Sequence, residues 1–131
     1  MMKRLCALLA FCSIATLLLI ACSSTSSAAS DPSTSGNQVH MSNTNFVQSS
    51  ITIKKGERVT LIADTFIPHT IANGTWENGT PKPSKEPDAP MIDDILVGGN
   101  SSETIGPFTR AGSFKLYCTV HPGMNLTVVV Q

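Results

Sequence analysis

Short runs of alternating hydrophobic and polar residues occupy residues 39–131. In one of them, Val59, Leu61 and Ala63 would face one side of an extended segment, while the residues between them face the other. Such a period of two residues is typical of a β-strand with one buried face. No segment of this region repeats its hydrophobic residues with the 3.6-residue period of a helix, so the pattern predicts an all-β domain.

Clusters of Gly, Pro, Asn and Lys separate these runs and predict turns between about seven or eight strands. The expected strands lie near residues 39–47, 51–53, 59–63, 69–72, 92–97, 103–105, 114–118 and 126–130. We expect Asn73-Gly74 to end the fourth strand, and residues 77–90, which hold four prolines, to form a loop. In the run near 114–118, Cys118 is expected to face the core and Tyr117 the opposite side. Short strands in this number predict a two-sheet Greek-key β-sandwich.

The N-terminus has a different hydrophobic pattern. Lys3 and Arg4 precede an almost unbroken apolar run of 16 residues from Leu5 to Ile20. A positive start followed by a short apolar stretch is typical of a secretory signal. The run is also somewhat shorter than the about 20 apolar residues that a membrane span requires.

The end of this run, Leu19-Ile20-Ala21-Cys22, resembles the lipobox of bacterial lipoproteins. The resemblance implies cleavage before Cys22 and attachment of lipid to its sulfur. We therefore expect residues 1–21 to be a lipoprotein signal peptide, and the remaining chain to be extracytoplasmic and lipid-anchored to a bacterial membrane. An ordinary signal peptide with a chance cysteine, or an uncleaved anchor, is the alternative, and both also place the chain outside the cytoplasm.

The composition of residues 22–38 predicts a tether. After Cys22, Ser, Thr, Ala and Gly dominate this segment, and no large apolar residue occurs in it. Such a composition cannot bury enough apolar surface to fold. We expect a flexible connection between the lipidated cysteine and a folded domain at residues 39–131.

The four cysteines become informative once they are placed on this plan. On this expectation Cys6 and Cys12 would leave with the signal peptide and Cys22 would carry lipid, so Cys118 alone would remain in the folded part. A single thiol cannot form an intramolecular disulfide and needs another reason, such as metal ligation or catalysis. The whole chain has zero net charge, and seven basic against nine acidic residues follow Cys22. This balance lacks the basic excess of a nucleic-acid-binding protein.

Cys118, His121 and Met124 form a Cys-x2-His-x2-Met motif at the end of an expected strand. Thiolate, imidazole and thioether are soft or borderline ligands, which suit copper in both oxidation states. A trigonal site of this kind needs a second imidazole, and the candidates are His40 and His69. His69 is favoured because it follows a stiffening proline between two expected strands, whereas His40 lies at the edge of the tether.

Two motifs carry a family resemblance, D-x3-P-H-T at residues 64–70 and G-x-F-x-L-Y-C-x2-H-P-G-M at residues 112–124. With one distant His followed by Cys, His and Met near the C-terminus, residues 39–131 resemble the cupredoxin family of blue copper proteins, in its plastocyanin/amicyanin-like form. The resemblance implies a single copper ion that cycles between Cu(I) and Cu(II). It further implies His69, Cys118 and His121 as equatorial ligands and Met124 as the axial ligand.

The same resemblance implies a membrane-tethered one-electron carrier, and not an enzyme, because a site of this type has no open coordination position. We expect a monomer that meets redox partner proteins at the membrane through the exposed edge of His121. An extracytoplasmic copper-binding or copper-delivery protein without a redox role is the alternative. A hydrolase that uses Cys118 and His69 is conceivable, but a β-sandwich with Met124 nearby gives it no support.

Overall fold

The computed structural model describes residues 36–131. The predicted signal peptide, the lipidation site Cys22 and most of the predicted tether lie outside these residues. Within the described part of the chain, no helix is long and apolar enough to cross a membrane. The strands of this part are β1 (Gln38–Met41), β2 (Ser50–Ile53), β3 (Val59–Ala63), β4 (His69–Glu77), β5 (Thr80–Pro83), β6 (Ile95–Val97), β7 (Ser102–Ile105), β8 (Gly112–Cys118) and β9 (Asn125–Val130).

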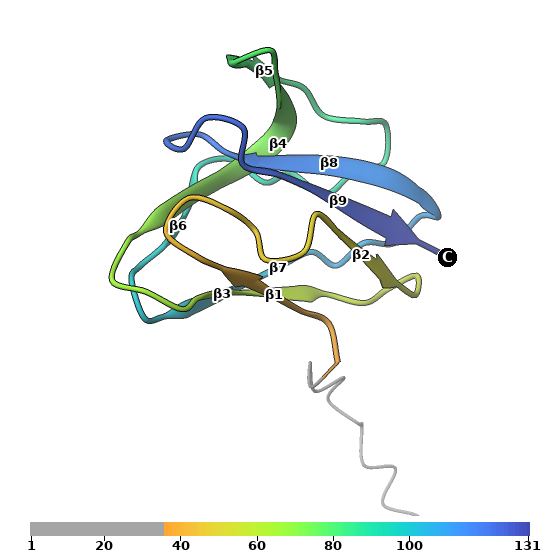
Figure 1. Cartoon of the computed structure of the whole chain (residues 1–131). Helices are drawn as coiled ribbons and strands as arrows, with labels where there is room; N and C mark the ends of the chain where they lie inside the picture. The colour runs from red at the N-terminus through yellow and green to blue at the C-terminus, as the bar shows by residue number, and fades with distance from the viewer. Residues whose placement is uncertain (1–35) are drawn as a thin grey trace, which may run out of the picture.

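These strands form two packed sheets (Figure 1). The smaller sheet has the order β1-β3-β7, and the larger has the order β2-β9-β8-β4-β5, with β6 paired to β4. β1 runs parallel to β3 and β2 runs parallel to β9, while the other pairs are antiparallel. The arrangement confirms the all-β two-sheet sandwich that the alternating pattern predicts, with a slightly larger number of strands.

The core lies between the two sheets and is built from every second residue of the strands. Val59, Leu61 and Ala63 are buried in β3, and Leu116 and Cys118 are buried in β8. Burial of each large aliphatic side chain contributes about 1.5–3 kcal/mol, so this layer holds the two sheets together. The largest fully buried side chains are Phe108, Met41, Leu61, Ile71, Leu116, Met124, Leu126 and His69.

The prediction that Asn73-Gly74 ends a strand was wrong. β4 continues to Glu77 and turns at Asn78-Gly79 into β5, so part of the expected loop at residues 77–90 is a β-hairpin. Asn78 and Gly79 both have positive φ angles, 49° and 75°, which is the backbone of a two-residue type I′ turn. The prolines of β5 indicated a loop, but an edge strand tolerates proline because it has one unpaired side.

Gly74 allows this hairpin to lie close to the larger sheet. Its φ angle is +135°, and a Cβ atom there would overlap the Lys82 carbonyl oxygen and come within 2.9 Å of the Tyr117 ring. The Trp76 ring also meets the Tyr117 ring edge-to-face, with centroids 6.1 Å apart. Tyr117 points away from the core side of β8 as expected, yet it is only 3% exposed because the hairpin lies against it.

The pairing of β4 with β8 brings two distant parts of the sequence together. Ile71 of β4 is the register partner of Cys118, the last residue of β8. His69, the first residue of β4, therefore lies at the same end of the sandwich as Cys118 and the turn that follows it.

Replacement of Gly74 by alanine tests the close approach of the hairpin. We expect Gly74→Ala to destabilise the protein by about 3 kcal/mol or more, because the new methyl group meets backbone atoms that cannot move aside. The control is Gly56→Ala, at φ +88° with no atom within 4 Å of the added Cβ, where only backbone strain of about 1–2 kcal/mol is expected. Urea unfolding measures both, and equal losses would contradict the close packing at Gly74.

Candidate metal centre

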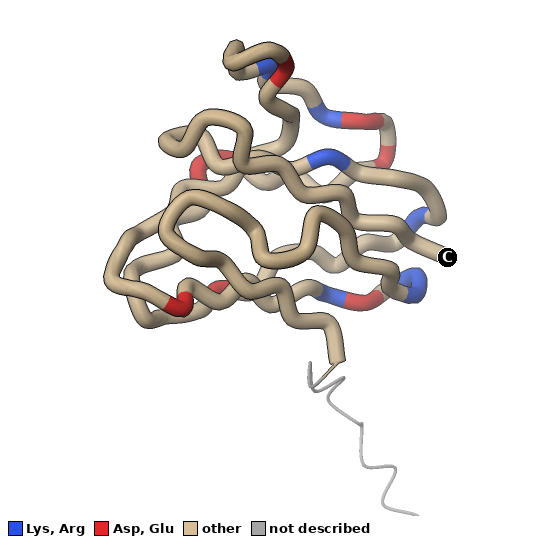
Figure 2. Tube along the Cα trace, viewed as in Figure 1, with Lys and Arg blue, Asp and Glu red and all other residues tan. Residues whose placement is uncertain are grey.

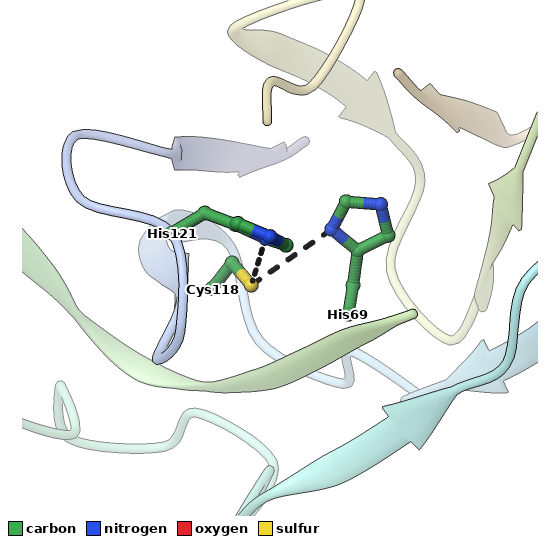
Figure 3. A group of neighbouring side chains, drawn as sticks. All are labelled: His69, Cys118 and His121. Carbon is green, nitrogen blue, oxygen red and sulfur yellow. Dashed lines mark hydrogen bonds between the residues drawn. The ribbon is translucent and has the colours of Figure 1, made fainter. Parts of the chain in front are cut away.

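Three side chains that could bind a metal converge at one end of the sandwich (Figure 3). His69 begins β4 and Cys118 ends β8, and both are completely buried, while His121 lies in the following turn and is partly exposed. The Cys118 Sγ atom lies 3.3 Å from His121 Nδ1 and 3.9 Å from His69 Nδ1. One ligand atom from each residue lies within 4.8 Å of the others.

The turn between β8 and β9 is closed by backbone hydrogen bonds. The Cys118 N–H donates to the Met124 carbonyl at 3.0 Å, and the Met124 N–H donates to the His121 carbonyl at 3.2 Å. On the other side of β8, the Thr119 N–H donates to the Thr70 carbonyl at 2.8 Å, which ties the start of the turn to β4. The tight turn therefore returns Met124, which is 1% exposed, to the buried end of Cys118.

The two imidazole rings lie close together in a partly dry environment. Their centroids are 4.9 Å apart, with an interplanar angle of 61°. Burial, and secondarily the neighbouring His121, lower the pKa of His69. The nearby backbone of Ser42 raises the pKa of His69 to a smaller extent. It does not form a hydrogen bond with the buried His69 Nε2. A neutral ring that keeps its proton on Nε2 presents a lone pair at Nδ1, on the side of Cys118.

The spacing of these donors fits a single metal ion. With zinc as the guide, an imidazole nitrogen binds at about 2.0–2.1 Å and a thiolate sulfur at about 2.3 Å, so three such donors around one ion lie about 3.5–3.8 Å apart. The two separations from Cys118 Sγ, 3.3 and 3.9 Å, bracket this range, and all three ligand atoms lie within 4.8 Å of one another. Two imidazoles and one thiolate with a methionine nearby form the donor set that selects copper for electron transfer.

His40, the other candidate imidazole, lies apart from this group. Its Nδ1 is 2.8 Å from an Asp64 carboxylate oxygen, and both side chains are more than two-fifths exposed. The group of possible ligands in the described residues contains His69, Cys118 and His121 and not His40. The structure therefore brings together the three equatorial residues that the sequence predicts, with Met124 closing the same turn.

Sequence reasoning missed Trp76, which contacts the backbone of this centre. Its indole N–H donates to the Cys118 carbonyl at 2.7 Å. The single tryptophan of the chain carries no local pattern that points to Cys118. The prediction that β4 ends at Asn73-Gly74 also concealed the contact, because Trp76 reaches Cys118 only through the continued strand.

Comparisons with known proteins agree with this geometry. The family model of copper-binding proteins of the plastocyanin/azurin family matches residues 33–131, and the chain belongs to that family. Amicyanin from Paracoccus versutus (Thiobacillus versutus) superposes with a TM-score of 0.55 at 23% identity, over 72% of this chain and 79% of that one. A reduced Cu(I) form of an amicyanin variant at pH 4 matches with a TM-score of 0.55 at 20% identity, over 72% and 80% of the two chains. A search of curated proteins finds no match.

These findings identify the cofactor class. The structural neighbours share the fold, and the family membership together with the His69-Cys118-His121 group makes copper the cofactor, as a single ion. The cupredoxin resemblance read from the two sequence motifs is thereby confirmed.

The lowered pKa of His69 predicts how the metal-free protein responds to acid. The folded state binds a proton at His69 more weakly than the unfolded chain does, where the pKa of a histidine has its ordinary value of 6.5. Stability is therefore fully present above that value and falls as the pH drops through the lowered folded pKa. We expect the free energy of unfolding in urea, with copper removed, to fall between about pH 7 and 5, and to fall less in His69→Gln. The same pH dependence in both proteins would contradict the assignment.

Proposed function

We propose that this protein is a one-electron carrier with a mononuclear type 1 copper site. His69, Cys118 and His121 are the equatorial ligands, and Met124 is the weak axial ligand. The observation that carries the proposal is the convergence of a buried thiol and two imidazole Nδ1 atoms at the spacing of a trigonal site.

The positions of the ligand residues favour electron transfer over copper release. When bound, copper supplies the Cu(I)/Cu(II) couple. His69 and Cys118 are held by paired strands with no solvent exposure, so their side chains cannot follow a change of metal charge by moving far. Cys118 has no solvent exposure, so water is also kept away from its sulfur. A rigid site of this kind requires little rearrangement at each transfer.

His121 gives this buried site its contact with the surface. It is partly exposed between Val120, which is 57% exposed, and the exposed Pro122. Two further exposed apolar side chains, Phe66 and Leu96, lie on segments that adjoin His69. The turn between β8 and β9 carries no Lys, Arg, Asp or Glu (Figure 2). An uncharged turn with exposed apolar side chains beside His121 suits brief contacts with a redox partner protein.

The tether would enter the domain at the end far from this surface. β1 is parallel to β3, with Gln38 beside Thr60 near the start of β3 and Met41 beside Ala63 at its end. Because the end of β3 leads into the loop before His69, the entry at Gln38 lies at the opposite end of the sandwich (Figure 1). We propose that lipid on Cys22 anchors this monomer outside the cytoplasm, with residues 22–38 as the tether, and this geometry would leave the copper end free.

The colour of the copper-loaded protein tests the ligand set. We expect the Cu(II) form to have the intense visible absorption and narrow EPR splitting of a blue copper site. Cys118→Ala and His69→Ala should each lose both signatures, because each removes one equatorial donor. His40→Ala is the matched control and should stay blue, since His40 pairs with Asp64 away from the centre.

A colourless copper-loaded wild-type protein would reject the type 1 assignment. Repeated reduction and oxidation then separates carrier from delivery protein. A carrier retains its copper through many cycles in the presence of a competing chelator, whereas a delivery protein loses copper in the Cu(I) state.

Membrane fractionation tests the anchor. We expect the full chain, expressed in a bacterium, to be found in the membrane fraction and to incorporate labelled fatty acid. Cys22→Ser should lose the label, while Cys12→Ser, within the signal segment, should behave as the wild type. Label retained in Cys22→Ser would contradict lipidation at this residue.

A further inference from the structure

The hairpin formed by the end of β4 and by β5 stands out at one edge of the larger sheet (Figure 1). Its Trp76 contacts the backbone of the copper centre. The Trp76 indole N–H donates to the Cys118 carbonyl oxygen over 2.7 Å, although the two residues are 42 positions apart in the chain. This is a direct link between the hairpin and the residue that supplies the sulfur of the proposed site.

The Cys118 carbonyl needs this donor because the ladder between β8 and β9 does not supply one. The register pairs Tyr117 with Asn125, which places Cys118 opposite Met124. The Cys118 N–H donates to the Met124 carbonyl, but the Met124 N–H turns to the His121 carbonyl instead of returning a bond to Cys118. A buried carbonyl without a partner is costly, and the indole N–H removes that cost.

Trp76 is itself held in place through its backbone and through its ring. The Asn125 side chain accepts a hydrogen bond from the Trp76 backbone N–H at 2.7 Å and donates one to the Trp76 backbone carbonyl at 3.0 Å. The ring edge contacts Tyr117, with centroids 6.1 Å apart. Asn125 directly follows Met124, so the hairpin is fastened to both ends of the turn that carries His121.

We propose that Trp76 is a positioning residue for the copper centre. By occupying the Cys118 carbonyl, the indole leaves the Met124 N–H free to close the turn onto His121. Without the indole, the Cys118 and His121 carbonyls compete for that one N–H, and the turn that sets the separation of the sulfur and the His121 ring loosens. This inference rests on the proposed function insofar as Cys118 and His121 bind copper.

The first test uses the metal-free protein and amide hydrogen exchange by NMR. Trp76→Phe keeps an aromatic ring against Tyr117 and removes the N–H donor. We expect the Cys118 and Met124 amides to exchange roughly three- to tenfold faster, which is the effect of losing one hydrogen bond. The Thr119 amide, bonded to Thr70 on the other side of β8, is the internal reference and should not change.

Two further variants separate positioning from general weakening of the hairpin. Asn125→Ala leaves the indole in the chain but releases its backbone, so it should accelerate exchange at Cys118 and Met124 in the same way. If Trp76→Phe does not fold, Asn125→Ala alone tests whether Trp76 positions the turn. Lys82→Met removes the exposed ion pair with Glu77, at 2.7 Å, and should leave these amides unchanged because such pairs contribute little.

The second test uses the Cu(II)-loaded proteins. A looser turn should shift the visible absorption and broaden the EPR spectrum in Trp76→Phe and Asn125→Ala but not in Lys82→Met. The proposal is overturned if exchange at Cys118 and Met124 does not rise, if Thr119 accelerates equally, or if Lys82→Met has the same effect. A wild-type protein without a blue copper spectrum would reject the proposed function, while the metal-free experiment would still decide whether Trp76 positions the turn.

Discussion

The antiparallel pairing of β4 and β8 is the interaction on which the rest of the structure depends. It brings His69, at the start of β4, beside Cys118, at the end of β8, although 49 positions separate them in the chain. The same strands contribute Ile71 and Leu116 to the core, so the burial that stabilises the sandwich also sets the separation of the nitrogen and the sulfur. A metal site built in this way gains rigidity from the fold because its ligands cannot separate without breaking the sheet.

The turn after β8 contributes His121 to the site, and a backbone hydrogen bond within the turn restricts its movement. His121 and Met124 follow Cys118 within six residues, and the backbone hydrogen bond from Met124 to His121 closes the turn. This bond uses the N–H that would otherwise extend the ladder between β8 and β9. The hairpin compensates with Trp76 on the Cys118 carbonyl. The missing hydrogen bond between Met124 and Cys118 in the ladder thus links the metal centre and the turn to the hairpin of β4 and β5.

Burial and exposure divide the centre into an inner and an outer side. His69 and Cys118 are completely buried, whereas His121 is partly exposed between the exposed Val120 and Pro122, in a turn that carries no charged residue. This division suits a carrier, in which the metal must be shielded from water and still lie near a surface that a partner can approach.

The sequence by itself determined the period of the strands, the class of fold and the residue types of the metal centre. Alternation in β3 and β8 predicted their buried faces, and Cys118, His121 and Met124 are so close in the chain that their spacing alone indicates copper chemistry. The local pattern failed in the hairpin, where prolines in β5 suggested a loop and Asn73-Gly74 suggested a strand end. Only the tertiary structure placed Trp76 on the Cys118 carbonyl and covered Tyr117. These contacts join residues about 40 positions apart. They depend on how closely Gly74 allows two strands to approach. The hydrophobic period along the chain contains no information about such an approach.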